Sequence, residues 1–348
     1  MSRLAPRLLA WQRQYGRNDL PWQHPRSAYR VWLSEIMLQQ TQVATVLSYF
    51  QRFVEALPDL PALAAASEDQ VLGLWSGLGY YRRARFLHAA AKQAMALHEG
   101  ELPADFDALL ALPGIGRSTA GAILAQAYGL PYPIMDGNVK RVLTRYHGIS
   151  GYPGLGPIEK QLWLHAEQHM PQTDTARYTQ AIMDLGALVC RRSQPDCPAC
   201  PLQDDCVAHR DGLTDSLPSP RPAKTLPTRQ TVMIILRDQD HRYLLQKRPV
   251  DGIWPGLWSL PEATDPGGAW HTAGRYARLD DALALESFDH IFSHYRLRIE
   301  PLLFDSVQAV PAVADGGEHR WYPHDELLHL GLPAPVRQLL QRCKDLNP

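Results

Sequence analysis

Apolar residues recur at helical spacing through residues 1–211. The pattern predicts helices in Tyr29–Phe53, Arg82–Leu97, Ser118–Tyr128, Val139–His147 and Ile158–His169, with Pro or Gly at the breaks. We therefore expect residues 1–211 to form a mainly α-helical domain.

The period changes after a proline-rich segment. Residues 212–228 hold four prolines and show no helical spacing, which predicts an extended interdomain linker. Beyond it, β-branched or alternating runs at Gln230–Arg237, His241–Gln246 and His294–Glu300 predict strands. We therefore expect residues 229–348 to form a separate α+β domain.

Composition places the chain among globular proteins, since 45% of its 348 residues are apolar and 20% are charged. No apolar run is long enough to span a bilayer, and the first residues lack the pattern of a secretory signal. We expect no membrane association and a cytoplasmic, bacterial-type location. The formal net charge of −1 does not indicate a polyanionic partner, so any nucleic acid must be bound by locally placed basic groups.

Four of the five cysteines, Cys190, Cys197, Cys200 and Cys206, fall in one short stretch and are separated by six, two and five residues. Scattered buried thiols rarely cluster in this way, and a reducing compartment disfavours disulfides, so the stretch predicts a metal centre. Four thiolates suit both zinc and an iron–sulfur cluster, and the spacing leaves the metal open. Cys343 is a lone thiol.

Two glycine-containing motifs have the character of DNA-holding elements. In Leu112–Gly121, Gly114 and Gly116 permit a tight turn before a helix N-terminus, which suits a DNA phosphate. The alternative is an ordinary helix–turn–helix corner. In Gly77–Arg85, two tyrosines stand beside three arginines, which suits an aromatic wedge flanked by phosphate contacts. The alternative is a core tyrosine before a solvated basic helix.

Glu35 is a candidate catalytic acid. On a helix, its neighbours one turn away are apolar, namely Val31, Trp32 and Leu38. Apolar surroundings raise the pKa of a carboxyl group and keep it protonated near neutral pH. Gln39 and Gln42, on the same side, are candidates for reading a base edge. The alternative is a frayed amphipathic face.

Asp136 is a candidate anionic partner. It lies directly before a predicted helix, where N-capping is the plain structural explanation. Capping also keeps a carboxylate ionised beside backbone N–H groups. A protonated acid opposite an ionised carboxylate is what cleavage of a glycosidic bond through an oxocarbenium-like state requires.

Together these motifs resemble those of the endonuclease III superfamily of helix–hairpin–helix DNA glycosylases, and within it the adenine DNA glycosylases. The resemblance covers essentially the whole chain and is carried by Ser34–Val43, Gly77–Tyr81, Leu112–Gly121, Met135–Val142 and the cysteine run. It implies a [4Fe–4S] cluster on the four cysteines. It also implies a monomer that acts on double-stranded DNA containing adenine mispaired with 8-oxoguanine or guanine.

The resemblance also suggests roles for individual residues. It implies that Glu35 and Asp136 are catalytic and that Tyr80 and Gln40 fill or wedge the base stack. Further expected contacts are Trp22, Gln23 and Gln180 in the adenine pocket, and Ser118 with the hairpin glycines on a phosphate. Members that also nick the backbone carry a lysine at the position of Ser118. A hydroxyl cannot form an imine, so we predict base removal without appreciable lyase activity.

The C-terminal domain resembles the MutT-like Nudix fold. Gly256 and Glu262 have the spacing that opens a Nudix box, but Trp270-His271 replaces the expected Arg-Glu and the later glutamate pair is missing. We therefore expect no pyrophosphatase activity. The resemblance implies instead that Phe292, Ser293 and His294 read 8-oxoguanine. Without it, these residues would simply be the entry to a strand.

Two other functions remain open at this stage. A bifunctional pyrimidine-lesion glycosylase/lyase would share the N-terminal motifs, but Ser118 and the MutT-like domain disfavour it. A non-catalytic lesion-sensing protein would keep the fold, but it would not need both Glu35 and Asp136.

Overall fold

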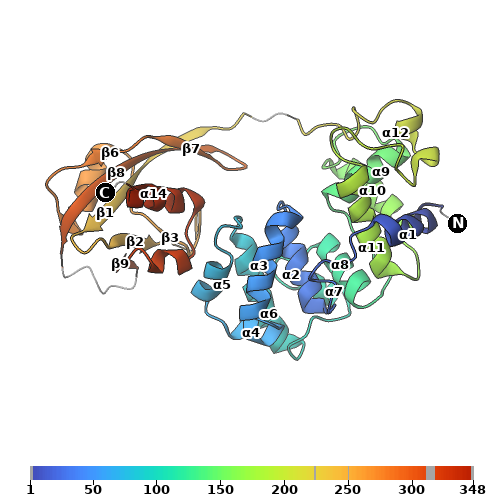
Figure 1. Cartoon of the computed structure of the whole chain (residues 1–348), viewed down its shortest axis with the longest axis horizontal. Coiled ribbons are helices and arrows are strands. Elements are labelled where there is room, and N and C mark those ends of the chain that lie inside the picture. Colours follow the sequence, from blue (N-terminus) through green and yellow to red (C-terminus); the bar gives the residue numbers. More distant parts are fainter. Residues whose placement is uncertain (1–2, 223–224, 250, 311–317, 346–348) are drawn as a thin grey trace. The chain divides into compact units, whose positions relative to one another are not determined.

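The computed structural model describes residues 3–222, 225–249, 251–310 and 318–345 (Figure 1). They form two units. The first contains the described residues of Met1–Ala65 and Phe86–Ala223, and the second those of Ala66–Arg85 and Lys224–Pro348. A stretch from the helical half of the sequence therefore packs with the C-terminal domain. Among the described residues, none of the helices combines the length and apolar character needed to cross a membrane.

The first unit is helical. Its helices are α1 (Leu4–Tyr15), α2 (Ala28–Leu38), α3 (Val43–Ala56), α4 (Leu60–Ala65), most of α6 (Arg82–Leu97), α7 (Phe106–Leu110), α8 (Arg117–Ala127), α9 (Gly137–His147), α10 (Gly156–His169), α11 (Thr175–Asp184) and α12 (Val207–Arg210). Side-chain oxygens cap several N-termini: Ser27 caps α2 and Asp105 caps α7. Gly148, at φ 64°, ends α9 in the left-handed conformation that glycine adopts without strain.

The helix predictions are confirmed within two residues at both ends, with one exception. Tyr29–Phe53 is not one helix, because α2 ends at Leu38 and α3 begins at Val43. Four consecutive polar residues separate them, and Gln40 has a φ of 60°. No apolar side chain in this break holds the chain against the core, so the helical path is not maintained.

The core of the first unit joins helices that are distant in sequence. Leu4 and Leu8 of α1 and Leu143 of α9 are fully buried in the same cluster as Leu162 of α10 and Ala181 of α11. Burial of such side chains contributes roughly 1.5–3 kcal/mol each to folding. This packing fixes the start of α9, where Asp136 lies.

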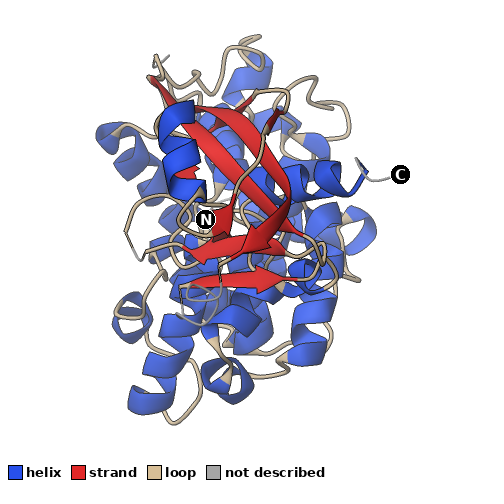
Figure 2. Cartoon of the chain, turned by 90° about the vertical axis from the view of Figure 1, so that its left-hand side faces the viewer, coloured by secondary structure: helices blue, strands red, loops and turns tan. Residues whose placement is uncertain are grey.

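The second unit is a sheet with a helix on each face. The strands, red in Figure 2, are β1 (Thr228–Asp238), β2 (Tyr243–Lys247), β3 (Trp258–Ser259), β4 (Glu262–Ala263), β5 (Ala277–Arg278), β6 (Leu283–Ala284), β7 (Phe288–Ile291), β8 (Arg296–Ala309) and β9 (His319–Tyr322). The longest ladder pairs β1 with β8 in parallel, and the central order is β3-β2-β1-β8-β5. The expected α+β fold is confirmed.

Alternating side chains of β1 pack on opposite faces of the sheet. Met233 and Ile235 join the core beneath α14 (Ala334–Asp345), while Val232 and Ile234 join the core beneath α13 (Pro266–Ala273). A strand buried on both faces reads as a continuous apolar run, as this one does in the sequence. The strand predicted at His294–Glu300 begins later, at Arg296, and extends to Ala309, because β1 pairs with Arg296–Val307 and β5 pairs with the last two residues.

Within the second unit, polar contacts join residues 66–85 to the C-terminal residues. The hydroxyl of Tyr81 donates to the carbonyl oxygen of Leu332 at 2.7 Å, and Lys247 pairs with Asp69 at 2.8 Å. Arg337 also hydrogen-bonds Ser76. The segment includes α5 (Glu68–Leu74) and the Gly77–Tyr81 motif.

Part of the predicted linker packs on the first unit. Leu217 is buried, and its carbonyl oxygen accepts a hydrogen bond from Nε of Arg145 at 2.8 Å. The backbone N–H of Gly151 donates to Ser219 at 3.3 Å. The ordered strand β1 then begins at Thr228.

Candidate active site

Glu35 lies on α2 among buried apolar side chains and is itself half-buried. Nε2 of Gln126, on α8, donates to its carboxylate at 3.2 Å. Burial raises the pKa of Glu35 to about 8, and the nearby charge of Asp136 contributes to the rise, while the Gln126 hydrogen bond opposes the shift. The group is therefore protonated at neutral pH.

Asp136 caps α9. One carboxylate oxygen accepts from the backbone N–H of Val139 at 2.7 Å, and the other accepts from Nδ2 of Asn138 at 3.3 Å. Capping alone would lower the pKa of this group. In the structure burial raises the pKa of Asp136 instead, opposed by these hydrogen bonds and by the charge of Arg141. The expectation of a cap is confirmed, while its effect on ionisation is smaller than that of burial.

Helix α8 contacts both carboxylate-bearing segments. Gln126 near its C-terminus reaches Glu35, and Ser118 near its N-terminus accepts a hydrogen bond from the backbone N–H of Met135 at 2.9 Å. A Cβ at Gly121 would lie 2.3 Å from the carbonyl oxygen of Pro133, so only glycine permits this approach. The hairpin helix thus sets the separation between Glu35 and Asp136.

The turn before α8 exposes backbone at a helix N-terminus. Gly114 has a φ of +75°, and Gly116 is the N-cap residue, where an added Cβ would have nothing within 4 Å. Both glycines are exposed, whereas Ser118 is half-buried and engaged with Met135. The exposed turn has the open N–H groups that a phosphate requires.

A cavity of about 420 Å³ opens beside α11. Gln23 and Gln180, both predicted to contact a base, line it and are almost fully buried. Trp22 does not line it, and its ring packs edge-on against Phe50 at 5.4 Å. Glu35 and Asp136 are not among the lining residues, which are Gln12, Asn18, Gln23, His24, Arg26, Gly129, Asp174, Thr175, Ala176, Arg177 and Gln180.

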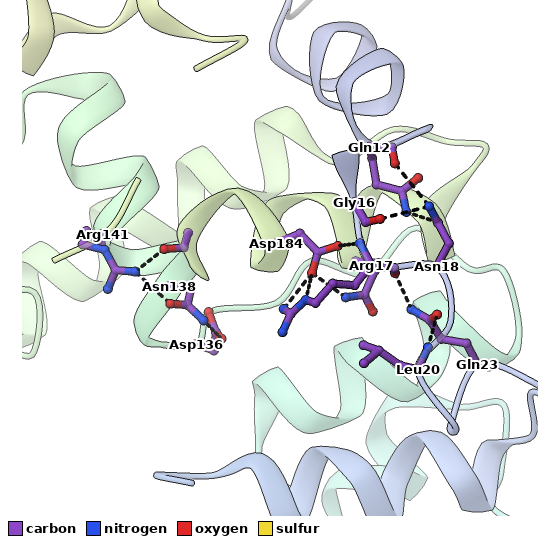
Figure 3. Close-up of polar contacts among 12 residues, drawn as sticks. Gln12, Gly16, Arg17, Asn18, Leu20, Gln23, Asp136, Asn138, Arg141 and Asp184 are labelled. Atoms are coloured by element: carbon purple, nitrogen blue, oxygen red, sulfur yellow. Dashed lines mark hydrogen bonds and ion pairs between the residues drawn. The ribbon is translucent and has the colours of Figure 1, made fainter. Parts of the chain in front are cut away.

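Beneath this cavity lies a buried ion pair that the sequence did not reveal. The carboxylate of Asp184 is fully buried and accepts three hydrogen bonds at 2.8 Å: from Nε and the backbone N–H of Arg17, and from Nε2 of Gln180 (Figure 3). Gln23 is held in turn, because its amide bonds Leu20 and Arg17. Oε1 of Gln180 is buried and has no hydrogen-bond partner among the described residues. It is an available acceptor at the cavity wall.

Two arginines on α9 hold the cysteine-containing loop. Arg141 donates to the carbonyl oxygens of Gly186 and Cys190, at 2.6 and 2.7 Å. It also donates to Asn138 (Figure 3). The buried Arg145 donates to the carbonyl oxygen of Arg191 at 2.7 Å, and its Nη1 lies 3.4 Å from Sγ of Cys190. Asn138, Arg141 and Arg145 were not predicted. Their spacing of three and four residues on one helix was the available signal.

The four clustered cysteines are half-buried, and none is in a disulfide. Burial raises the pKa of Cys200 to about 12, and the charges of the other three thiols contribute. The pKa values of Cys197 and Cys206 are also raised, chiefly by burial and in part by neighbouring thiols. The structure therefore brings the four thiols into one electrostatic neighbourhood.

The predicted wedge and base-reading residues lie in exposed positions. Gln39, Gln40 and Gln42 are exposed in the break between α2 and α3. Tyr80 in the second unit is 56% exposed and has a φ of 50°, with the guanidinium of Arg83 over its ring. A left-handed conformation at a non-glycine residue carries a conformational cost.

Phe292, Ser293 and His294 form the turn between β7 and β8. The ring of Phe292 stacks on Tyr295 at 4.7 Å and lies 5.3 Å from Trp254. Ser293 and His294 are exposed. The apolar ring thus anchors a turn whose two polar side chains face solvent.

The sequence is similar to two protein-family models. Residues 33–168 match the HhH-GPD superfamily of base excision DNA repair proteins, and residues 231–342 match the NUDIX domain. The adenine DNA glycosylase of Buchnera aphidicola (subsp. Acyrthosiphon pisum) is 38% identical over 97% of this chain and 96% of its own. The human adenine DNA glycosylase is 35% identical over 98% of this chain and 74% of its own.

Solved structures resemble the helical part. A thermostable thymine-DNA glycosylase superposes with a TM-score of 0.55 at 26% identity, covering 60% of this chain and 95% of that one. A non-covalent endonuclease III–DNA complex gives a TM-score of 0.50 at 22% identity, covering 61% and 99%. The latter shows a shared fold.

The fold and the matched superfamily define a DNA-acting glycosylase of base excision repair that carries a Nudix domain. The adenine DNA glycosylases named above align with this chain at more than 30% identity over nearly its full length. The chain therefore belongs to the adenine DNA glycosylase family.

Proposed function

We propose that the protein removes adenine mispaired with 8-oxoguanine or guanine from double-stranded DNA, acting as a monomer. The proposal is carried by one observation: the protonated Glu35 and the capped Asp136 interact within one site. An acid and an anion held close together are the pair that hydrolysis of a glycosidic bond requires.

In the proposed reaction, adenine is flipped out of the stack and Glu35 donates its proton to N7 of the base. The C1′–N9 bond then breaks, and the bonding electrons leave with the protonated adenine. Glu35, now ionised, takes a proton from water as the oxygen bonds to C1′. The raised pKa of Glu35 suits both roles, because it lies near neutrality.

Asp136 is assigned the stabilisation of the sugar cation. Burial raises its pKa, yet it receives two hydrogen bonds and the charge of Arg141, whereas Glu35 receives one hydrogen bond. It therefore ionises more readily than Glu35. This difference supports the assignment of Glu35 as the acid and Asp136 as the anion.

Other residues are assigned to holding the DNA. Gln23 and Gln180 are proposed to contact the flipped base from the cavity, and Trp22, which packs on Phe50, is assigned no direct contact with the base. The exposed turn of Gly114 and Gly116 suits a phosphate. Proposed base-stack contacts come from the exposed side chains of Gln39, Gln40, Gln42 and Tyr80.

Ser118 supports a monofunctional reaction. Its hydroxyl accepts a hydrogen bond from Met135 and cannot form an imine with the sugar, so no covalent lyase intermediate is expected at this position. We assign Ser118 to fixing the hairpin on the Asp136 segment, with any phosphate contact secondary.

The four cysteines fit a [4Fe–4S] cluster. All four belong to the described residues, and no three of their sulfurs lie within 4.8 Å of one another. A single tetrahedral zinc ion with Zn–S bonds of about 2.3 Å needs sulfurs about 3.8 Å apart. The wider separation and the adjacent Arg145 favour a larger anionic cluster. A cluster held by these four cysteines would stabilise the fold of this loop.

In the second unit we assign recognition of 8-oxoguanine to Phe292, Ser293 and His294. The stacked Phe292 keeps the turn in place, and the exposed hydroxyl and imidazole offer hydrogen-bonding groups to a base edge. Because the Nudix carboxylates are missing, we assign this domain to binding and not to hydrolysis.

The test is strand scission of an adenine:8-oxoguanine duplex with and without alkali. We expect free adenine and an alkali-labile site, with little scission in the absence of alkali. Scission without alkali, together with a borohydride-trapped adduct, would instead support a bifunctional lyase. Binding without adenine release would support a lesion sensor.

A further inference from the structure

Three histidines in the first unit meet away from the carboxylates and the cysteines. His147 is the last residue of α9, and His165 and His169 lie one turn apart on α10, in the sequence His165-Ala-Glu-Gln-His169. Two histidines at this spacing share one helix face, which is how helical zinc sites present two ligands. The neighbouring helix supplies the third.

The imidazole nitrogens converge. One ligand nitrogen from each ring lies within 4.8 Å of the other two, and Nε2 of His147 is 2.8 Å from Nε2 of His169. Among the described residues, this is the only such group of three metal-binding side chains. Zinc–nitrogen bonds of about 2.0–2.1 Å place ligand nitrogens on the order of 3.3 Å apart. The nitrogens of His147 and His169 would therefore need to separate only slightly to bind zinc.

One ring nitrogen of the cluster is not satisfied by hydrogen bonding. His147 and His165 stack at 3.6 Å with nearly parallel rings, a geometry without a hydrogen bond between them. Nδ1 of His165 is buried and has no hydrogen-bond partner among the described residues. Buried polar atoms are normally paired, so the unpaired nitrogen of His165 is consistent with a missing ligand.

The surroundings of His147 and His169 also affect their pKa values. Burial lowers the pKa of His147 to about 4, and the charges of His165 and His169 contribute to the shift. Burial and His165 lower the pKa of His169 to about 4 as well. Burial therefore disfavours the charged form of both rings.

We propose that His147, His165 and His169 form a second metal site, which binds a divalent transition-metal cation such as Zn²⁺ and leaves its remaining coordination position to water. Imidazole ligands suit zinc, copper and nickel. The ion would join the C-terminal end of α9 to α10. Because Asp136 caps the N-terminus of α9, the ion would stabilise the helix that positions this residue.

The test uses cluster-loaded, full-length protein, with the iron content checked so that the cysteines are occupied. Zn²⁺ is titrated into wild-type protein and into His165→Phe, which keeps an aromatic ring for stacking but removes the ligand nitrogens. His98→Phe is the matched control, because His98 lies in the same unit outside the cluster.

We expect wild type and His98→Phe to bind one zinc ion more than His165→Phe, or to bind it at least about tenfold more tightly. Zinc should raise the thermal midpoint of the first two proteins only. Equal zinc binding and equal thermal shifts in all three would overturn the proposal and leave a metal-free histidine stack.

A second measurement does not depend on any variant folding. Wild-type crystals soaked in Zn²⁺ should give an anomalous-scattering peak among the three imidazoles. A peak elsewhere, or none, would exclude the site. Neither readout uses adenine excision, so the result is separate from the proposed reaction.

Discussion

The two units hold their candidate functional groups in opposite ways. In the first unit, Glu35 and Asp136 are half-buried and held by hydrogen bonds from Gln126, Asn138 and Val139. In the second, Tyr80 and His294 are exposed, and ring contacts anchor the neighbouring backbone. Proton transfer needs perturbed carboxyl groups at fixed positions, whereas stacking on bases needs exposed rings. Substitutions in the first unit should therefore lower the rate of adenine release, whereas those in the second unit should weaken recognition of the mispair.

The largest expected effect is on the acid. Glu35→Gln keeps the shape and the Gln126 hydrogen bond but has no proton to donate, so single-turnover adenine release should fall by about 10³-fold. Glu55→Gln, an exposed glutamate on α3, is the matched control and should be unaffected. A Glu35→Gln rate within about tenfold of wild type would show that Glu35 is not the acid.

The next effect is on the anion. Asparagine caps helices as well as aspartate does, so Asp136→Asn should remain as stable as wild type while adenine release falls by about 10²-fold. Asp105→Asn makes the same change at the N-cap of α7 and should leave the rate unchanged. If Asp136→Asn lowered the free energy of unfolding together with the rate, the role of Asp136 would be limited to capping α9.

Burial of Glu35 should also appear in stability. Its pKa rises from 4.5 to about 8 on folding, so the folded state resists ionisation and wild-type stability is lost as pH rises between these values. Glu35→Gln avoids this cost. Its advantage in unfolding free energy over wild type should grow by about 2 kcal/mol across this range, allowing for partial solvent access. Denaturant unfolding at several pH values measures it, and a constant difference would contradict the raised pKa.

The smallest effects belong to the second unit. Tyr80→Ala and Phe292→Ala should each lower the rate or affinity for the 8-oxoguanine mispair by about tenfold while adenine chemistry persists. Tyr15→Ala, an exposed aromatic in the first unit, is the control. If Phe292→Ala weakened guanine and 8-oxoguanine mispairs equally, the contrast between the units would lose its basis in recognition.

Local patterns predicted much of the fold. The helix at Arg82–Leu97 was predicted with its observed ends, because apolar spacing alone defines it. The cap at Asp136 follows from the residue types that begin a helix. The division at 39–42 was missed because helical periodicity tolerates short polar runs, whereas packing does not.

The unpredicted parts of the site are long-range. Gln126 reaches Glu35 across 91 residues, and Arg17 reaches Asp184 across 167. No local pattern reports such pairs, because the fold creates them. The ionisation of Asp136 could not be predicted from the sequence either. Burial raises its pKa whereas capping lowers it, and only the folded structure shows how buried the group is. The catalytic and cluster assignments themselves stay predictions until the variants are measured.

Helix α9 has a consequence for the order in which the protein becomes active during synthesis. Its arginines are anchored by carbonyl oxygens that emerge later from the ribosome, at Gly186, Cys190, Arg191 and Leu217. A nascent chain that ends before these residues already contains both carboxylates but lacks the groups that hold Asp136's helix in place. Competence for excision should therefore arise only late in synthesis.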